Sequence, residues 1–256
     1  MVFVNSSSND NIDIEFNNNL VTKQPKLRVP PVISLNVGKT GNSNYPVYIG
    51  IDAWLDLLSH AFSVQDREIG GVLVGELCTK PIDQSNYLDI TASIEASNAV
   101  EERDSLKFTH DTWNDIYIQV EQSYKGFYLL GWYHSHPGFN VFMSNSDKFI
   151  HSNFFSLSYQ IAVVVDPILK KLKIFYLEGG DFKETGEIFV YINVDNKIQV
   201  MNLLKFLYPN ESPSKAEIFF NKLLLSMERK DNKAERLAVC ISNERISELP
   251  DDFFSR

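Results

Sequence analysis

The sequence is poor in cysteine, has no long apolar run and has no excess of basic residues. Its 256 residues include two cysteines, Cys78 and Cys240, without the paired spacing of a disulfide framework or a cysteine zinc site. We therefore expect a reducing, cytoplasmic setting. The formal net charge of −9 and the lack of a basic cluster argue against a nucleic-acid partner. No apolar run approaches the roughly 20 residues of a membrane span, and residues 1–6 lack the features of a signal peptide, so no membrane partner is expected.

Composition divides the chain into three parts. Residues 1–28 are rich in Asn, Ser and Asp, which predicts a disordered polar N-terminal segment. Residues 29–195 carry alternating strand and helix patterns, and 44% of the whole chain is hydrophobic, which is enough for one sizeable core. Residues 196–256 have apolar stripes at helical spacing and are expected to form a helical C-terminal extension.

The apolar pattern of the middle part predicts an α/β (α+β) fold. Strands are expected at residues 32–37, 47–49, 68–76, 87–96, 127–133, 159–165, 172–177 and 187–194. A first helix is expected to begin at Asp52, a second at Thr109 or Asp111, and a third to run from Ser146 to Phe155. Residues 98–107 read as a polar, acidic loop. The irregular alternation of strands and helices predicts a mixed sheet with helices on both sides.

Three residues of this middle part form a candidate metal site. His134 and His136 are two residues apart on a predicted strand, so both side chains point to the same side, ~6.5–7 Å apart. Asp147, at the start of the next predicted helix, can supply a third ligand. Two imidazole nitrogens and one carboxylate oxygen suit one zinc ion and leave a fourth position open for water. The alternative is a pair of surface or core histidines without a metal.

Two further residues are candidates for catalysis. Glu68 stands at the leading edge of a Gly-rich, apolar strand, where desolvation would raise its pKa towards that of a useful general base. Its alternative role is a salt bridge with a neighbour such as Arg67. Ser144, three residues before Asp147, is a candidate hydrogen-bond donor to an oxyanion, and its alternative role is that of a turn residue.

Together these residues resemble the signature of the JAMM/MPN+ (Mov34/PAD-1-like) zinc metalloproteases. The signature reads here as Glu68, then His-Ser-His-Pro over residues 134–137, then Ser-Asn-Ser-Asp over residues 144–147. The resemblance covers residues 48–194 and is closest to the subunits that act in the proteasome lid and the signalosome. It implies an MPN/JAMM domain with a cytidine-deaminase-like mixed sheet. It also implies zinc ligands at His134, His136 and Asp147, a general acid/base at Glu68, and an oxyanion donor at Ser144.

The resemblance further implies a function. It predicts hydrolysis of isopeptide or peptide bonds after the C-terminal Gly-Gly of ubiquitin or a ubiquitin-like protein, with conjugates or precursors of such proteins as substrate. A partner MPN protein or another complex subunit is a possible companion. One alternative is a non-catalytic MPN scaffold subunit of a multiprotein complex. Another is an amidohydrolase-type barrel, which needs several downstream histidines, whereas only His151 follows here.

Several positions depart from the family pattern or stand outside it. Residues 141–142 are Val-Phe where close relatives carry Cys-Trp, which is expected to alter loop packing without removing a ligand. In the acidic segment 99–104, one of the carboxylates could cap the zinc in a resting state; the alternative is a solvated loop. His110 is expected at a helix start and His151 on a helix surface, and neither is assigned a function.

Overall fold

The computed structural model describes residues 24–31, 34–36, 45–186 and 188–191. The helices are α1 (Ile51–Ser63), α2 (His110–Ser123) and α3 (Asn145–Phe154). The strands are β1 (Lys26–Leu27), β2 (Ser34–Asn36), β3 (Val47–Gly50), β4 (Gly70–Thr79), β5 (Asn86–Glu95), β6 (Val100–Glu101), β7 (Leu106–Lys107), β8 (Tyr128–Ser135), β9 (Ile161–Asp166), β10 (Lys171–Glu178), β11 (Asp181–Glu184) and β12 (Ile188–Tyr191). Most of the N-terminal segment predicted at residues 1–28 lies outside these residues, but its described end forms β1, which pairs with β4, so the predicted disorder is wrong for that end. The predicted C-terminal helical extension at residues 196–256 lies wholly outside the described residues.

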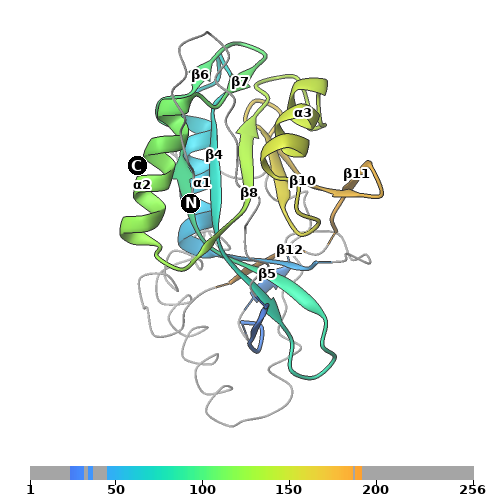
Figure 1. Cartoon of the computed structure of the whole chain (residues 1–256). Helices are drawn as coiled ribbons and strands as arrows, with labels where there is room; N and C mark the ends of the chain where they lie inside the picture. The colour runs from blue at the N-terminus through green and yellow to red at the C-terminus, as the bar shows by residue number, and fades with distance from the viewer. Residues whose placement is uncertain (1–23, 32–33, 37–44, 187, 192–256) are drawn as a thin grey trace, which may run out of the picture.

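The strands form one large mixed sheet and one small hairpin (Figure 1). The large sheet has the order β11-β10-β9-β8-β4-β5-β3-β12-β2, and β1 adds to β4 in parallel. Strand β8 lies in the centre, antiparallel to β4 and parallel to β9. The small sheet pairs β6 with β7. The predicted mixed sheet is therefore confirmed, and its central strand carries the histidine run.

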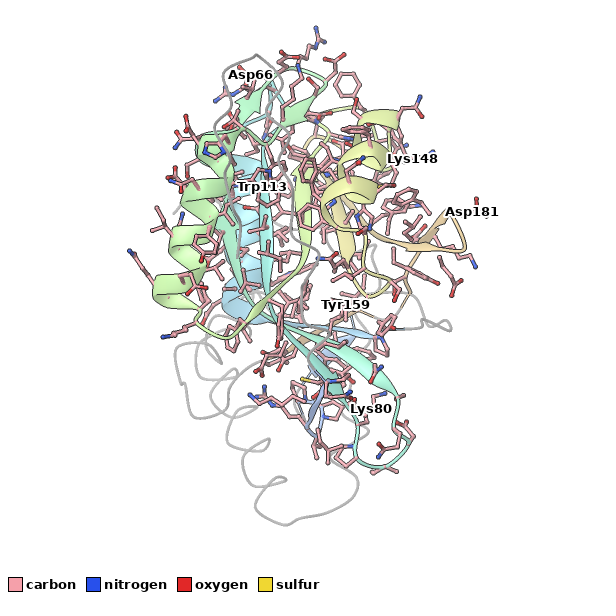
Figure 2. The ribbon with its side chains drawn as sticks, in the orientation of Figure 1. Asp66, Lys80, Trp113, Lys148, Tyr159 and Asp181 are labelled. Atoms are coloured by element: carbon pink, nitrogen blue, oxygen red, sulfur yellow. The ribbon has the colours of Figure 1, made fainter. Side chains whose placement is uncertain are left out.

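The large sheet is covered on both faces, and each face has its own hydrophobic core. Successive side chains of a strand point to opposite faces, and β8 shows this directly. Tyr133 packs with Trp54 of α1 on one face, whereas Trp132 packs with Ile116 of α2 and Ile150 of α3 on the other. Side chains fill the space between the helices and the sheet (Figure 2). The predicted placement of helices on both sides is confirmed.

Close contact between β4 and β8 depends on glycine. Gly70 is paired with His134, and a Cβ atom at this position would lie 2.3 Å from the carbonyl oxygen of Tyr133 and 3.2 Å from Cα of His134. Both atoms belong to the backbone, so they could move away only if β8 itself moved. The glycine therefore lets the strand that carries His134 lie directly against β4.

We expect Gly70→Ala to lower the free energy of unfolding by about 1–3 kcal/mol, because the added methyl overpacks a rigid backbone contact. Chemical denaturation measures this loss. Gly50→Ala is the matched control, since its added methyl would meet its nearest neighbour, the Tyr191 ring, at an ordinary 3.5 Å. Equal stability of the two variants would contradict the proposed close contact.

Three further details of the expected fold were wrong. Helix α1 begins at Ile51 with Gly50 as its N-cap, because β3 runs straight into the helix, and Asp52 lies in the first turn without capping it. Residues 98–107 are not only a loop, since they contain the hairpin of β6 and β7. The short strand β11 was missed; it forms by returning along β10 and has no apolar alternation of its own. Within the described ranges, no helix has the length and apolar character needed to cross a membrane.

Candidate metal centre

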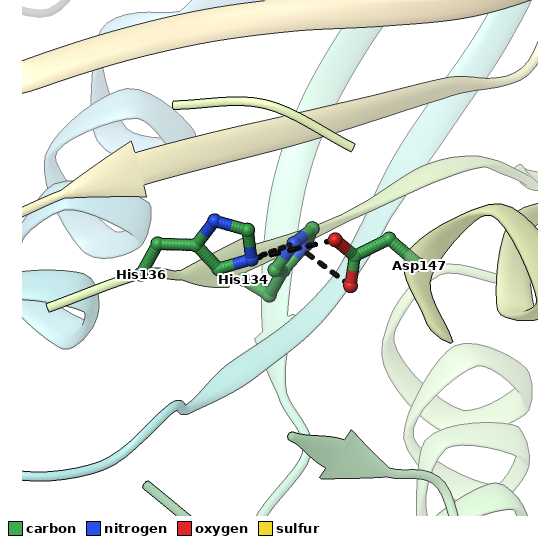
Figure 3. A group of neighbouring side chains, drawn as sticks. All are labelled: His134, His136 and Asp147. Atoms are coloured by element: carbon green, nitrogen blue, oxygen red, sulfur yellow. Dashed lines mark hydrogen bonds and ion pairs between the residues drawn. The ribbon is translucent and has the colours of Figure 1, made fainter. Parts of the chain in front are cut away.

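Strand β8 and helix α3 bring three buried donor side chains together (Figure 3). His134 lies near the end of β8, His136 directly follows that strand, and Asp147 is in the first turn of α3. The Nε2 atoms of the two histidines are 3.2 Å apart. Asp147 Oδ1 lies 3.2 Å from Nε2 of His134, and Oδ2 lies 3.4 Å from Nε2 of His136. All three residues are at most 3% exposed.

These distances suit a small tetrahedral metal ion. Zinc bonds to nitrogen and oxygen at about 2.0–2.2 Å, which places neighbouring tetrahedral ligands about 3.3–3.6 Å apart. One of the observed separations, 3.4 Å, lies within this range and the other two, 3.2 Å, lie just below it; the donor set is the nitrogen and oxygen type that zinc accepts. Each residue offers one ligand atom, and the three form a candidate metal group. The residues predicted as ligands thus fit a zinc ion, and their role as ligands stays a prediction.

Electrostatics keep two of these donors in the state that a metal requires. Burial alone would raise the pKa of Asp147, but the His134 and His136 imidazoles and the bond from Ser144 hold it well below the usual value. Burial lowers the pKa of His134, so its imidazole is neutral at neutral pH. Metal ligands must be an ionised carboxylate and neutral imidazoles, so Asp147 and His134 are ready to bind.

Glu68 lies beside this group, just before β4. Its Oε1 is 3.5 Å from Nε2 of His136, and the residue is 4% exposed. Burial raises the pKa of its carboxyl to about 7. The alternative salt bridge with Arg67 does not form, because Arg67 Nε donates to Glu101 at 2.9 Å. Glu68 is therefore available to the metal group, as its predicted catalytic role requires.

Backbone pairing to β8 fixes the chain next to Glu68. Ile69 donates its N–H to Oγ of Ser135 at 3.1 Å, and Ser135 donates its own N–H to the carbonyl of Ile69 at 2.9 Å. Ser135 is fully buried. Ser135 thus ties the segment of Glu68 to the strand of the histidine pair.

Ser144 is the N-cap of α3. Its Oγ accepts the Asp147 N–H at 3.1 Å, and its own N–H donates to Asp147 Oδ2 at 2.7 Å, which forms a capping box. The bond to Oγ uses an oxygen lone pair, so the hydroxyl proton is still available for donation. Its predicted role as an oxyanion donor is compatible with this cap, and the cap connects Ser144 to the candidate ligand Asp147.

We expect Ser144→Ala to lower the free energy of unfolding by about 1 kcal/mol through loss of the cap. If Ser144 also donates to an oxyanion, kcat falls by about 10²–10³-fold. Thr109→Ala is the matched control, because Thr109 caps α2 with the same capping box away from the metal group. If Ser144→Ala and Thr109→Ala lose equal stability and keep equal activity, Ser144 acts only as a helix cap. Urea denaturation and single-substrate kinetics make the comparison.

The acidic segment does not direct Glu101 or Glu102 at the metal group. Glu101 pairs with Arg67, while Glu102 accepts from the Ser105 hydroxyl at 2.7 Å and from Lys107 at 3.4 Å. Glu101 and Glu102 are therefore engaged away from the metal group, and a cap by a carboxylate of this segment stays a prediction. The hairpin does contact the site through its backbone, since the Glu68 N–H donates to the Glu102 carbonyl at 2.8 Å.

Asp166, which the sequence reasoning did not single out, holds the loop after β8. Its fully buried carboxylate accepts the backbone N–H groups of Gly138 at 3.0 Å and Asn140 at 2.7 Å. The carbonyl of Asn140 in turn lies 3.2 Å from Nδ1 of His136. A usable signal was present, because an Asp-Pro pair ends a buried strand at this point. Asp166 thus acts on the candidate ligand His136 indirectly, because it holds Asn140, whose carbonyl contacts the His136 ring.

His151 is fully buried, so its expected place on a helix surface was wrong. It lies one turn after Asp147 in α3, and this turn packs against the sheet. Its Nδ1 accepts the indole N–H of Trp132 at 3.2 Å. His110, in contrast, is the first residue of α2, as expected.

Comparisons with known proteins identify the class of domain that carries this site. The family described as JAB1/Mov34/MPN/PAD-1 ubiquitin protease matches residues 42–158. The chain is 32% identical over 126 residues to "Ubiquitin carboxyl-terminal hydrolase RPN11" of Saccharomyces cerevisiae, covering 48% of this chain and 39% of that protein. It is 32% identical over 133 residues to "26S proteasome non-ATPase regulatory subunit 14" of Dictyostelium discoideum, with the same coverage. It is 29% identical over 114 residues to "COP9 signalosome complex subunit 5" of Kluyveromyces lactis, covering 43% of this chain and 28% of that protein.

Residues 42–158 therefore match an MPN-type domain, and the expected resemblance to the JAMM/MPN+ family is confirmed. The matched part spans about two fifths of the length of the first two relatives. It includes all five candidate site residues.

Proposed function

We propose that this protein is a zinc-dependent hydrolase of the JAMM type. It cleaves isopeptide or peptide bonds after the C-terminal Gly-Gly of ubiquitin or a ubiquitin-like protein. The observation that carries this proposal is the convergence of His134, His136 and Asp147 at 3.2–3.4 Å beside the buried carboxyl of Glu68. This arrangement lies in a domain whose relatives include a protein named as a ubiquitin carboxyl-terminal hydrolase.

Each residue has a task that its surroundings support. A bound zinc ion supplies Lewis acidity and lowers the pKa of a coordinated water. His134, His136 and Asp147 hold the ion. Glu68 accepts a proton at its carboxylate and returns it to the leaving amine, which requires a group that can be either charged or neutral near pH 7. Ser144 donates its O–H to the oxygen of the attacked carbonyl.

The relatives' names also suggest a setting. They include a subunit of the 26S proteasome and a subunit of the COP9 signalosome. We propose that this protein acts in the cytoplasm as a subunit of a multiprotein complex, next to a second MPN protein or another subunit. Its substrates are ubiquitin-like conjugates or precursors, and its one metal ion per chain is zinc.

The test combines metal content with cleavage. Zinc is measured by elemental analysis in the full chain and in His136→Ala, and both are incubated with isopeptide-linked diubiquitin and with a linear fusion after Gly-Gly. About one zinc per chain, lost in the variant, together with zinc-dependent cleavage after Gly-Gly, supports the proposal. Zinc without cleavage of either substrate favours the non-catalytic scaffold. If the full chain holds no zinc after the metal has been added back, the proposal of a zinc-dependent hydrolase is overturned.

A further inference from the structure

The two candidate histidine ligands differ in how their rings are held. A ligating histidine usually donates its second ring N–H to a carbonyl or carboxylate, which fixes the ring for the metal. His136 follows this rule, since its Nδ1 lies 3.2 Å from the carbonyl of Asn140. His134 does not, because its buried Nδ1 has no hydrogen-bond partner among the described residues. Something else must hold the ring of His134.

An indole ring provides that support. The rings of Trp132 and His134 are stacked, with centroids 4.3 Å apart and an angle of 13° between their planes. Both residues are on the same face of β8 and both are fully buried. Stacking over this distance fixes the plane of the imidazole, and the plane of the imidazole determines where Nε2 points.

The indole is itself fixed by His151. The Trp132 Nε1–H donates to Nδ1 of His151 at 3.2 Å. An indole nitrogen can only donate, so Nδ1 of His151 must be the acceptor and its imidazole must be neutral. Burial lowers the pKa of His151 to about 4, which agrees with a neutral ring. Phe155 and Phe182 pack against His151, with ring centroids 6.2 and 5.3 Å away.

Strand β8 and helix α3 are therefore connected at two levels. At the first level Asp147 of α3 contacts His134 of β8, and one helical turn later His151 contacts Trp132 of the same strand. The second contact fixes the position of α3 along β8, and with it the distance between His134 and Asp147. Trp132 and His151 lie behind the metal group and do not belong to it.

We propose that Trp132 and His151 are positioning residues that orient the His134 ring for the metal through stacking and a single indole hydrogen bond. The inference rests on the metal site of the proposed function. It predicts that the bond between Trp132 and His151 affects metal binding, although neither residue touches the metal.

The experiment uses the full chain, four single variants and the double variant Trp132→Phe/His151→Leu. Trp132→Phe keeps an aromatic ring and removes the N–H, His151→Leu removes the acceptor, and His151→Gln restores an acceptor oxygen. His110→Leu, at an exposed helix start, is the control. Zinc affinity is measured by competition with a chelator, and the visible spectrum of the cobalt-substituted protein reports the geometry of the ligands. Urea denaturation of the metal-free proteins reports stability separately.

We expect Trp132→Phe and His151→Leu each to raise the Kd for zinc by about 10-fold or more and to shift the cobalt spectrum. The double variant should bind no more weakly than either single one, because both changes remove the same bond. His151→Gln should recover most of the affinity. A merely structural role would lower the stability of the metal-free variants and leave affinity and spectrum unchanged, which would overturn the inference. If the wild type binds zinc but His151→Leu does not fold, the zinc Kd and the cobalt spectrum of Trp132→Phe and His151→Gln test the inference instead. A wild type that binds no zinc would instead overturn the metal site itself.

Discussion

We expect Glu68→Gln to lose about 10²–10⁴-fold in kcat while the protein keeps its zinc. The amide has nearly the shape of the carboxyl group but cannot take up a proton. Since none of the three candidate ligand atoms belongs to Glu68, metal content should stay at the wild-type level. The measurement pairs the rate of Gly-Gly cleavage with elemental analysis of the same sample.

The fold should tolerate this change. Burial raises the pKa of Glu68 to about 7, so the ionised carboxylate is less favourable in the folded protein than in water. Replacing it by a neutral amide should leave the free energy of unfolding equal or higher. Glu76→Gln is the matched control, because Glu76 is a shielded carboxylate on β4 that pairs with Lys26 at 2.7 Å, away from the metal group. Wild-type activity in Glu68→Gln, or loss of activity in both variants, would contradict the assigned role.

Replacement of Asp147 should have the largest effect on the metal. Asp147→Asn keeps a side-chain oxygen for the Ser144 N–H but removes the charge, so we expect no bound zinc and an intact start of α3. Asp147→Ala removes both the side-chain oxygen and the charge. At a zinc concentration of 100 times the Kd, loss of the metal alone lowers the free energy of unfolding by about 2.7 kcal/mol. The missing capping interaction adds about 1 kcal/mol in the alanine variant.

Thermal or urea denaturation with and without zinc separates these contributions. The wild type should gain stability when zinc is added, whereas both Asp147 variants should not. Asp111→Asn is the control, since Asp111 is an exposed acidic residue in the first turn of α2. If Asp147→Asn gained as much stability from zinc as the wild type, the carboxylate would not be a ligand.

Local patterns in the sequence were sufficient to predict most elements and the core of the site. The two-residue period of a strand places His134 and His136 on one side, and the short connection to a capped helix brings Asp147 back to them. The Gly-rich, apolar run was predicted as a strand, and β4 is buried there with close backbone neighbours. The irregular alternation of strands and helices predicted a mixed sheet with helices on both sides, which two separate cores confirm.

Other features depend on how distant segments pair, and no local pattern encodes that. The placement of Glu68 beside His136 follows from the antiparallel register of β4 and β8, which lie far apart in the chain. A carboxylate of the acidic segment was predicted as a possible cap on the metal, but Glu101 pairs with Arg67 and Glu102 pairs with Ser105 and Lys107. A polar helix gave no sign that His151 would be buried, because burial is decided by the surface that α3 meets.

The sequence by itself thus predicted the candidate ligands, the secondary structure around them and the class of domain. The tertiary structure alone decided that Glu68 lies beside these candidates and that Asp166, Trp132 and His151 pack around them. The physical reason is that periodicity and capping act within a few residues, whereas burial, ring stacking and hydrogen bonds between elements depend on a register that only the packed chain fixes.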